Sequence, residues 1–167
     1  MAWTRQLETA LLPALRLDAY PKSVIEVYVT VLENDGEMAT LAHSISCASL
    51  ALADAGIQMN DIVVGVSGVR FTLKRCILQQ KLKGLKQVTS KEGVVCLDAT
   101  RENELAAAGS FMASFCPMLN VLTQLLQDGA QTPEQAVSLI HHASETASLL
   151  YGVMRHCLLG ALQSEST

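Results

Sequence analysis

The sequence has 167 residues, of which 50% are hydrophobic, 17% charged and 4% aromatic. That length suits one domain with a substantial core, since roughly two-thirds of the unfolded surface is buried at this size. Ten glycines and four prolines are too few for a linker, a collagen-like repeat or a disordered tail. The formal charge of −4 would ordinarily argue against a nucleic-acid partner.

The first two predicted elements are a helix and a strand. Apolar residues at helical spacing predict a helix over Thr4–Leu17, although Pro13 must bend it or delay its start. Over Ser23–Glu33, β-branched residues alternate with polar ones, which is the pattern of a half-buried strand. The Asn-Asp-Gly sequence at 34–36 then predicts a turn.

A change to helical spacing predicts a second helix over Met38–Gly56, with Gly56 as its C′ residue. Its apolar face consists mainly of alanine and serine, so we expect the helix to lie very close to a sheet. This stretch also contains His43 and Asp54, and an aspartate inside a membrane needs a partner. We therefore expect a soluble protein and no membrane partner.

A buried strand is predicted over Asp61–Ser67, followed by a basic segment that is predicted to be helical over Thr72–Lys86. The 22 residues from 70 to 91 hold seven of the twelve basic residues and no acid, so the rest of the chain has a net charge of −11. Such a segment meets a phosphate backbone or an acidic neighbour, or is simply a solvated face, which is the commoner case. The candidate RNA-binding residues are Arg70, Lys74, Arg75, Lys81, Lys83 and Lys86.

The remainder of the chain predicts three strands and a long helix. The strands are expected over 93–98, 110–116 and 119–125. Thr132, Pro133 and Gln135 form the signature of a helix N-terminus, and one apolar face then continues to Ala161. Together the elements predict an α+β fold in which a mixed sheet is layered with helices.

The five cysteines are odd in number and contain no Cys-x-x-Cys pair, so we expect buried free thiols in a reducing compartment. Glu8 interrupts the stretch in which a secretory leader would be apolar, so we expect no leader. The cysteines are Cys47, Cys76, Cys96, Cys116 and Cys157.

No residue pattern identifies an active site by itself. His141 and His142 lie near Glu145, but adjacent histidines point about 100° apart on a helix, so we expect a surface or helix-face role rather than a metal site. Ser67 lacks the pattern of a nucleophile elbow. The acids Asp98, Glu102 and Glu104 could form an acid/base or magnesium cluster, but such residues after a strand are usually solvated loop positions.

Several segments of the chain resemble the RNase PH family. The resemblance covers nearly the whole chain except the basic segment, and it implies an RNase PH fold, of the type of ribosomal protein S5 domain 2, in a single domain over 1–167 with a basic insertion at about 68–92. The matching segments are Ala14–Arg16, Tyr20–Pro21, Val31–Gly36, Ala51–Ile57, Cys96–Thr100 and Ala106–Gly109.

The resemblance also implies where a phosphorolytic site would lie. In active members an arginine and backbone amides after the Asp-Gly hold the attacking phosphate, and Ala39 stands in place of that arginine here, with Glu37 adding a repelling charge. Active members also carry a carboxylate before a methionine at the start of the later strand, where this chain has Gly109 or Ser110. Glu104 matches the outer acid of the pair, and we expect it to be stranded.

From this resemblance we expect a non-catalytic structural subunit of the RNA exosome ring, with neither catalytic nor metal-binding residues and no cofactor. Its partners would be other RNase PH-like ring subunits, exosome cap subunits and RNA, in the nucleus, nucleolus and cytoplasm. The alternatives are a phosphate-dependent 3′-to-5′ exoribonuclease, which run in reverse would be a nucleotidyl transferase, and a truncated product without a stable role. Family domains begin with strands that precede the first helix found here, so we expect exposed sheet edges and apolar surface.

Overall fold

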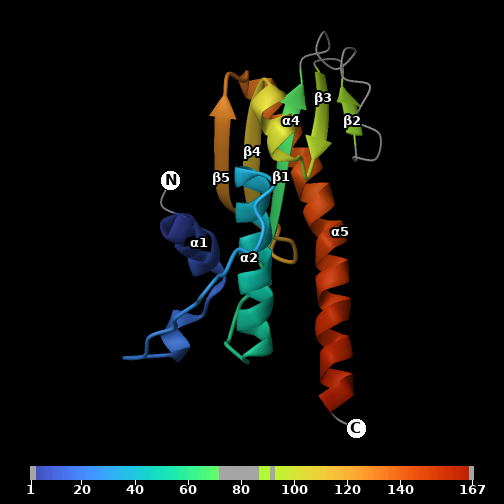
Figure 1. Cartoon of the computed structure of the whole chain (residues 1–167). Coiled ribbons are helices and arrows are strands. Elements are labelled where there is room, and N and C mark those ends of the chain that lie inside the picture. The colour runs from blue at the N-terminus through green and yellow to red at the C-terminus, as the bar shows by residue number, and fades with distance from the viewer. Residues whose placement is uncertain (1–2, 72–86, 91–92, 166–167) are drawn as a thin grey trace.

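A computed structural model describes residues 3–71, 87–90 and 93–165, and it contains a five-stranded sheet in the order β2-β3-β1-β4-β5 (Figure 1). All four pairs of neighbouring strands are antiparallel. Two short 3₁₀ turns, Leu12–Ala14 and Leu17–Ala19, follow the first helix. The helices and strands are α1 (Trp3–Leu11), α2 (Glu37–Asp54), β1 (Val64–Phe71), β2 (Gln87–Ser90), β3 (Gly93–Leu97), α4 (Arg101–Ala106), β4 (Gly109–Cys116), β5 (Val121–Gly129) and α5 (Pro133–Glu165).

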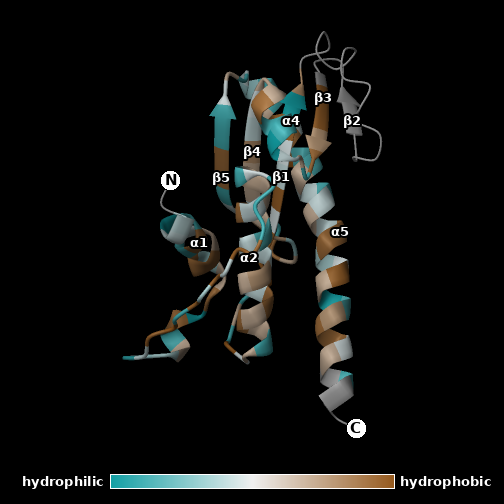
Figure 2. Ribbon diagram, in the orientation of Figure 1, coloured by the Kyte–Doolittle hydropathy of each residue, from teal (hydrophilic) through white to brown (hydrophobic). Residues whose placement is uncertain are grey.

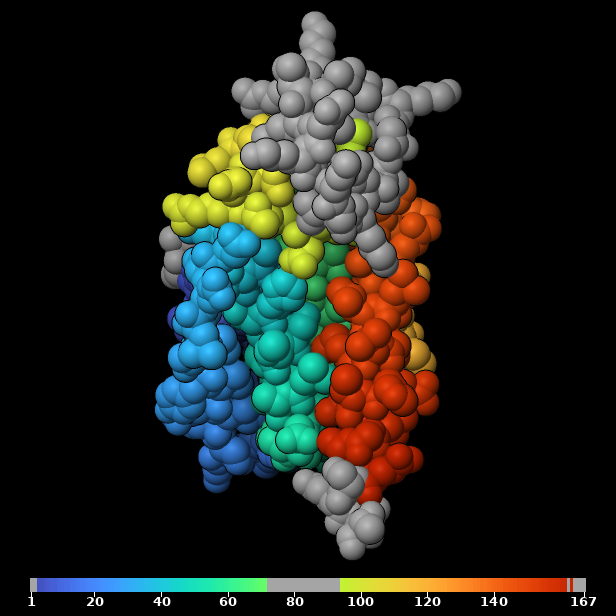
Figure 3. All heavy atoms as spheres, turned by 45° about the vertical axis from the view of Figure 1, so that its right-hand side comes forward, coloured from blue at the N-terminus to red at the C-terminus, as the bar shows by residue number. Residues whose placement is uncertain are grey.

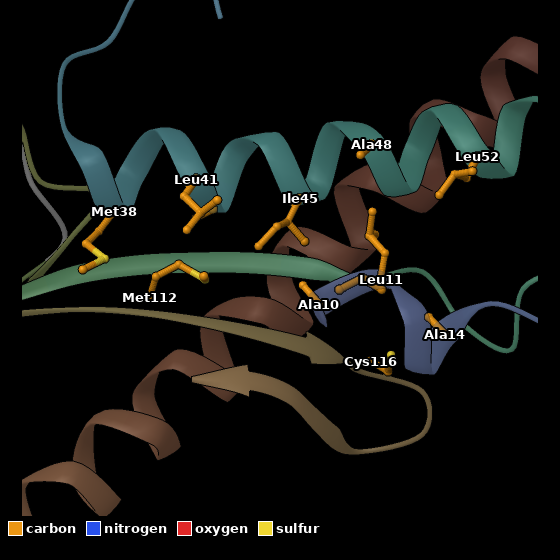
Figure 4. Packing of buried hydrophobic residues seen from close by; sticks show 12 residues of the cluster. Ala10, Leu11, Ala14, Met38, Leu41, Ile45, Ala48, Leu52, Met112 and Cys116 are labelled. Carbon is orange, nitrogen blue, oxygen red and sulfur yellow. The ribbon is translucent and has the colours of Figure 1, made fainter. Parts of the chain in front are cut away.

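Helices cover both faces of the sheet, because alternate residues of a strand point to opposite faces. On β4, Met112 packs with α1 and α2 (Figure 4), whereas Phe111 packs with α5. On β1, Val69 and Phe71 lie on the same face as Gly65, which meets α2, and pack with Ala99 before α4 and with Ala106 and Ala107 at its end. The core therefore forms two layers, one on each side of the sheet.

Helix α2 lies unusually close to β1. A Cβ built on Gly65 would be 2.2 Å from the carbonyl oxygen of Ala42, so only glycine fits at this contact. Two serines of α2 bond to the strand backbone: Ser46 Oγ accepts from Gly65 N at 2.9 Å, and Ser49 Oγ accepts from Val63 N at 2.8 Å. The close approach expected from the small residues of this helix is thus confirmed.

Two predicted helix ends are also confirmed, the end of α2 and the start of α5. At the end of α2, Gly56 has φ 72°, and the amide of Ile57 donates to Leu52 O at 3.0 Å, as in a Schellman motif. At the start of α5, Thr132 N donates to Gln135 Oε1 at 3.2 Å and Gln135 N donates to Thr132 Oγ1 at 3.4 Å, which is a capping box. Helix α5 continues for 33 residues, farther than the apolar pattern indicated.

Three predictions about local structure need correction. The predicted strand over Ser23–Glu33 is wrong: the segment runs beside α2 without joining the sheet, because no described strand pairs with it (Figures 1 and 3). The first helix ends at Leu11, since Pro13 places the next turn in a 3₁₀ helix. Of the three acidic residues after β3, Glu102 and Glu104 lie in helix α4, whereas Asp98 lies in the connection before it.

The α+β fold, a sheet layered with helices, is confirmed, although its pairs are antiparallel rather than mixed. Strand β1 begins three residues later than predicted and ends at Phe71, inside the range expected for the basic insertion. The helix predicted over Thr72–Lys86 lies outside the described residues. Among the described helices, none combines the length and hydropathy that crossing a membrane requires.

Candidate anion site at the N-terminus of α2

The candidate site begins at the turn that leads into α2. Gly36 is the N-cap residue and has no side chain with which to cap the helix. Asn34 organises the turn instead, because its Oδ1 accepts from Gly36 N and from Thr40 Oγ1, both at 3.1 Å. The first amides of the helix remain available to an acceptor from another part of the chain.

Glu104 of α4 is that acceptor. Its Oε2 accepts from Glu37 N at 2.9 Å and its Oε1 accepts from Met38 N at 3.0 Å. A Cβ on Gly36 would lie 3.0 Å from Ala99 O and 3.1 Å from Glu104 Oε1, so a side chain there would crowd the carboxylate. Glu104, which we expected to lack the second acid of a catalytic pair, instead accepts hydrogen bonds at the start of α2 with both of its oxygens.

This arrangement fills an anion-binding position with an anion from the chain itself. The N-terminus of a helix attracts anions through its unpaired amides and its dipole. A phosphate approaching these two amides would have to displace the carboxylate of Glu104. The exposed carboxylate of Glu37 lies at the same helix end and would also repel it.

The first two turns of α2, all of them described, offer little positive charge to a phosphate. Ala39, which stands where the resemblance places an arginine, is buried. His43, farther along α2, has its Nε2 3.5 Å from Asp98 Oδ1, and both side chains are mainly exposed. The site therefore brings together acids from α2, α4 and the end of β3, with His43 beside one of them.

The two positions for the absent carboxylate lie at the start of β4. A Cβ on Gly109 would be 2.8 Å from Asp128 O and 3.0 Å from Gln131 Nε2, so the backbone leaves no room for a side chain there. Ser110 is half-buried and pairs across the ladder with Val69, on the face that α2 and α4 cover. The hydroxyl of Ser110 cannot replace a carboxyl group as the general acid near neutral pH.

Of the candidate RNA-binding residues, the structure describes Arg70 alone. Arg70 is a buried residue of β1, and its Nη2 donates to Ala130 O at 2.8 Å. A guanidinium in this position is turned into the protein rather than toward a polymer in solvent, so we leave Arg70 out of the RNA proposal. The other five lie outside the described residues: Lys74, Arg75, Lys81, Lys83 and Lys86.

The histidine pair on α5 meets one acid. His141 Nδ1 and His142 Nδ1 each lie 3.6 Å from an oxygen of Glu145, and the three ligand atoms lie within 4.8 Å of one another. Because this is the one such group that the described residues form, Asp98, Glu102 and Glu104 do not make a metal cluster. The expected surface role of the histidines stays a prediction.

Of the four cysteines that the structure describes, two are buried and two are exposed. Cys96 and Cys116 are buried, whereas Cys47 and Cys157 are exposed, so the expectation of buried thiols holds for two of these four. Burial, with a smaller contribution from the charge of Asp61, raises the pKa of Cys116 from 9.0 to about 11. Cys116 is therefore protonated and unreactive near neutral pH.

Comparisons with known proteins agree with this fold. Residues 1–58 match the model of the 3′ exoribonuclease family, domain 1. The chain is 34% identical over 158 residues to the exosome complex component mtr3 of Schizosaccharomyces pombe, covering 95% of this chain and 55% of the relative. It is 34% identical to exosome complex component MTR3 of Mus musculus over 157 residues, covering 93% of this chain and 50% of the relative.

Two further comparisons extend the likeness. Exosome complex component Rrp41 of Pyrobaculum calidifontis is 35% identical over 155 residues, covering 93% of this chain and 54% of the relative. The crystal structure of rice Rrp46 superposes with a TM-score of 0.75 at 21% identity, covering 94% of this chain and 64% of that one, which shows the shared fold. The chain thus spans about half the length of the curated relatives it matches. The resemblance to the RNase PH family is confirmed, and the chain is similar to exosome complex components over nearly all of its own length.

Proposed function

We propose that this chain is a non-catalytic structural subunit of the RNA exosome ring, pairing with another RNase PH-like subunit and helping to enclose a channel for RNA. One observation carries the non-catalytic part of the proposal: the two amides at the start of α2 are held by Glu104. The likeness to mtr3 and MTR3 over more than nine-tenths of this chain supports the placement in an exosome ring.

The chemistry of the site supports the absence of phosphorolysis. A phosphate needs a fixed cation and free donors, and at this place the chain offers a buried alanine and amides that already have an acceptor. It also needs an acid for the leaving oxygen, and Gly109 has no space for one. Restoring one of these three features alone would not restore a reaction.

The edge strand β5 supports pairing with another subunit. One side of β5 is unpaired among the described strands, and four apolar side chains on it or just before it are exposed by 37–50%. An apolar edge of this kind favours contact with a partner over contact with water. The four residues are Leu119, Val121, Leu122 and Leu125.

The assembly is tested by co-expression with candidate RNase PH-like exosome subunits, followed by size-exclusion chromatography with light scattering. We expect a stoichiometric heterodimer with one of them, and we expect Val121→Lys to weaken it while Gln127→Lys, on the same exposed strand, does not. A chain that ignores every such subunit would overturn the ring-subunit proposal. A chain that aggregates both alone and with partners would favour the truncated product without a stable role.

The activity is tested on the same heterodimer with a 3′-labelled RNA and inorganic phosphate. We expect no release of nucleoside diphosphate beyond that of the partner alone. Phosphate-dependent release above that level, if lost per assembled complex in the Glu104→Ala heterodimer, would instead support the exoribonuclease alternative. RNA contact by Lys81, Lys83 and Lys86 is a separate part of the proposal, and charge reversal of the three should lower RNA retention by the assembled ring.

A further inference from the structure

The segment before α2 has the alternating sequence pattern of a strand but makes none of the backbone hydrogen bonds of a strand. Ser23 N donates to Tyr20 O at 3.3 Å at one end of it, and Asp35 O accepts from Arg101 N at the other. Between them, from 24 to 33, no backbone group bonds to another backbone group of the described chain. Ten residues of exposed backbone with this composition form a template for strand pairing.

The side chains of this segment alternate in exposure as they do in a strand with one covered face. Val24, Tyr28 and Leu32 are exposed by 84%, 86% and 95%, whereas Val27 and Val29 are exposed by 41% and 37%. Figure 2 shows the apolar residues along this segment. One face of it is therefore directed at the protein and the other at solvent.

The covered face lines an apolar cavity of about 560 Å³. The odd-numbered residues from Ile25 to Val31 form one wall, Leu7 and Leu11 of α1 a second, and Leu52 of α2 a third. A second copy of the segment, paired edge to edge, would place its own odd-numbered residues on the same face and extend this apolar wall. The apolar surface exposed here is thus suited to receive β-branched side chains at every second position.

The sequence of the segment matches its own reverse in residue type. In an antiparallel pair centred on Tyr28, Val24 faces Leu32 and Ile25 faces Val31 of the other strand. Val27 likewise faces Val29, and Glu26 faces Thr30. The two tyrosines lie directly opposite each other on the outer face, where cross-strand aromatic pairs are favourable.

We propose that residues 24–32 pair with the same segment of a second copy of this chain, antiparallel and about a two-fold axis at Tyr28. This proposal goes beyond the exosome-ring function, because it concerns the chain's association with itself. The pairing is self-complementary, as an isologous interface requires.

The charges favour this register. Glu26 is the one charged residue between 23 and 32, and it faces a threonine rather than its own copy. The two Glu26 side chains are four residues apart along the ladder, or about 13 Å at roughly 3.3 Å per residue. A shift by an odd number of residues would place apolar side chains opposite polar ones on both surfaces, so the alternation excludes it. Among the registers that remain, the one centred on Tyr28 places the two tyrosines opposite each other.

Sedimentation velocity of the isolated full chain over a range of concentrations tests the proposal. We expect a monomer–dimer equilibrium that Tyr28→Lys weakens about tenfold or more, since it removes the aromatic pair and sets two cations face to face. The matched control is Thr30→Lys, which adds the same charge to the same exposed face but opposite Glu26. It should leave the dimer at least as tight as in the unsubstituted chain.

Mixing two variants tests the register itself. Tyr28→Lys and Tyr28→Glu should each be largely monomeric alone and should form a mixed dimer together, because only a residue on the two-fold axis meets its own counterpart. Circular dichroism shows whether each variant keeps its fold. A monomer at every concentration would overturn the proposal, as would a dimer that is equally sensitive to both lysine substitutions or insensitive to both.

Discussion

Glu104 is predicted to stabilise the fold as an external cap of α2. In Glu104→Ala, the amides of Glu37 and Met38 lose their acceptor. Replacing a side chain that caps a helix costs about 0.5–2 kcal/mol, and the loss of a negative charge at a helix N-terminus adds about 0.3–1 kcal/mol. Because Glu104 is half-buried and its site is partly screened, we expect the free energy of unfolding to fall by about 1–2 kcal/mol.

Two further variants make this measurement specific. Glu104→Gln keeps one acceptor oxygen but loses the charge, so we expect roughly half of that loss. Glu102→Ala makes the same substitution at an exposed position of α4 and should stay within about 0.5 kcal/mol of the unsubstituted chain.

Urea unfolding followed by circular dichroism measures the stability of all three variants. The slope of the transition is compared among them as a check on two-state behaviour. Equal stabilities of Glu104→Ala and Glu102→Ala would refute the assignment of Glu104 as the cap. A second readout is calorimetric titration with inorganic phosphate. We expect no binding by the unsubstituted chain and weak binding by Glu104→Ala, in which the two amides are free.

Three further predictions concern packing and thiols. In urea unfolding, Gly65→Ala should lower the free energy of unfolding by about 3 kcal/mol or more, because its methyl group would lie 2.2 Å from Ala42 O. The control Gly152→Ala has open space around the new methyl group and should be neutral or stabilising by up to about 1 kcal/mol. A thiol reagent at neutral pH should modify Cys47 quickly and Cys116 only on unfolding, as peptide mapping would show. Because the pKa of Cys116 is raised from 9.0 to about 11 in the folded chain, its contribution to stability is complete below pH 9 and falls by roughly 2–3 kcal/mol as the pH rises to 11. Urea unfolding of Cys116→Ala over the same pH range should lack that component, and a parallel decline in both chains would contradict it.

Short-range patterns in the sequence predicted the helix ends and the close helix–sheet contact. Thr132 and Gln135 are three residues apart, so their reciprocal bonds follow from local spacing. The alanines and serines of α2 likewise indicated a close approach, although the sequence did not indicate that Gly65 would receive it. Features that depend on one element or on small residue size are therefore predictable at this level.

The strand predicted over Ser23–Glu33 shows where such reasoning stops. Its alternation is that of a strand, and the observed exposures retain the same period of two. Alternation specifies which face is buried, but a strand also needs a neighbour to satisfy its amides and carbonyls. No local signal states whether that neighbour is present.

The contact between Glu104 and α2 was missed for a different reason. The residues that it joins are 66 and 67 positions apart, and no spacing rule links an acid in a short helix to the start of another helix. The resemblance to the RNase PH family pointed to Glu104 and to the start of α2, but as two separate departures from an active site. The structure shows that the carboxylate of Glu104 accepts hydrogen bonds from the first amides of α2.

This pairing gives the site a structural role that does not require chemistry. Arg101 N donates to Asp35 O just before α2, and three residues later Glu104 bonds to the first amides of α2, so α4 is fixed to the turn at two points. Helix α4 in turn leads into β4, which pairs with the edge strand β5. A change at Glu104 should therefore reduce both stability and assembly through β5, while any RNA degradation by a partner subunit stays unchanged per assembled complex. An effect on the partner's rate per complex, with assembly intact, would mean that the acid acts on RNA or phosphate directly.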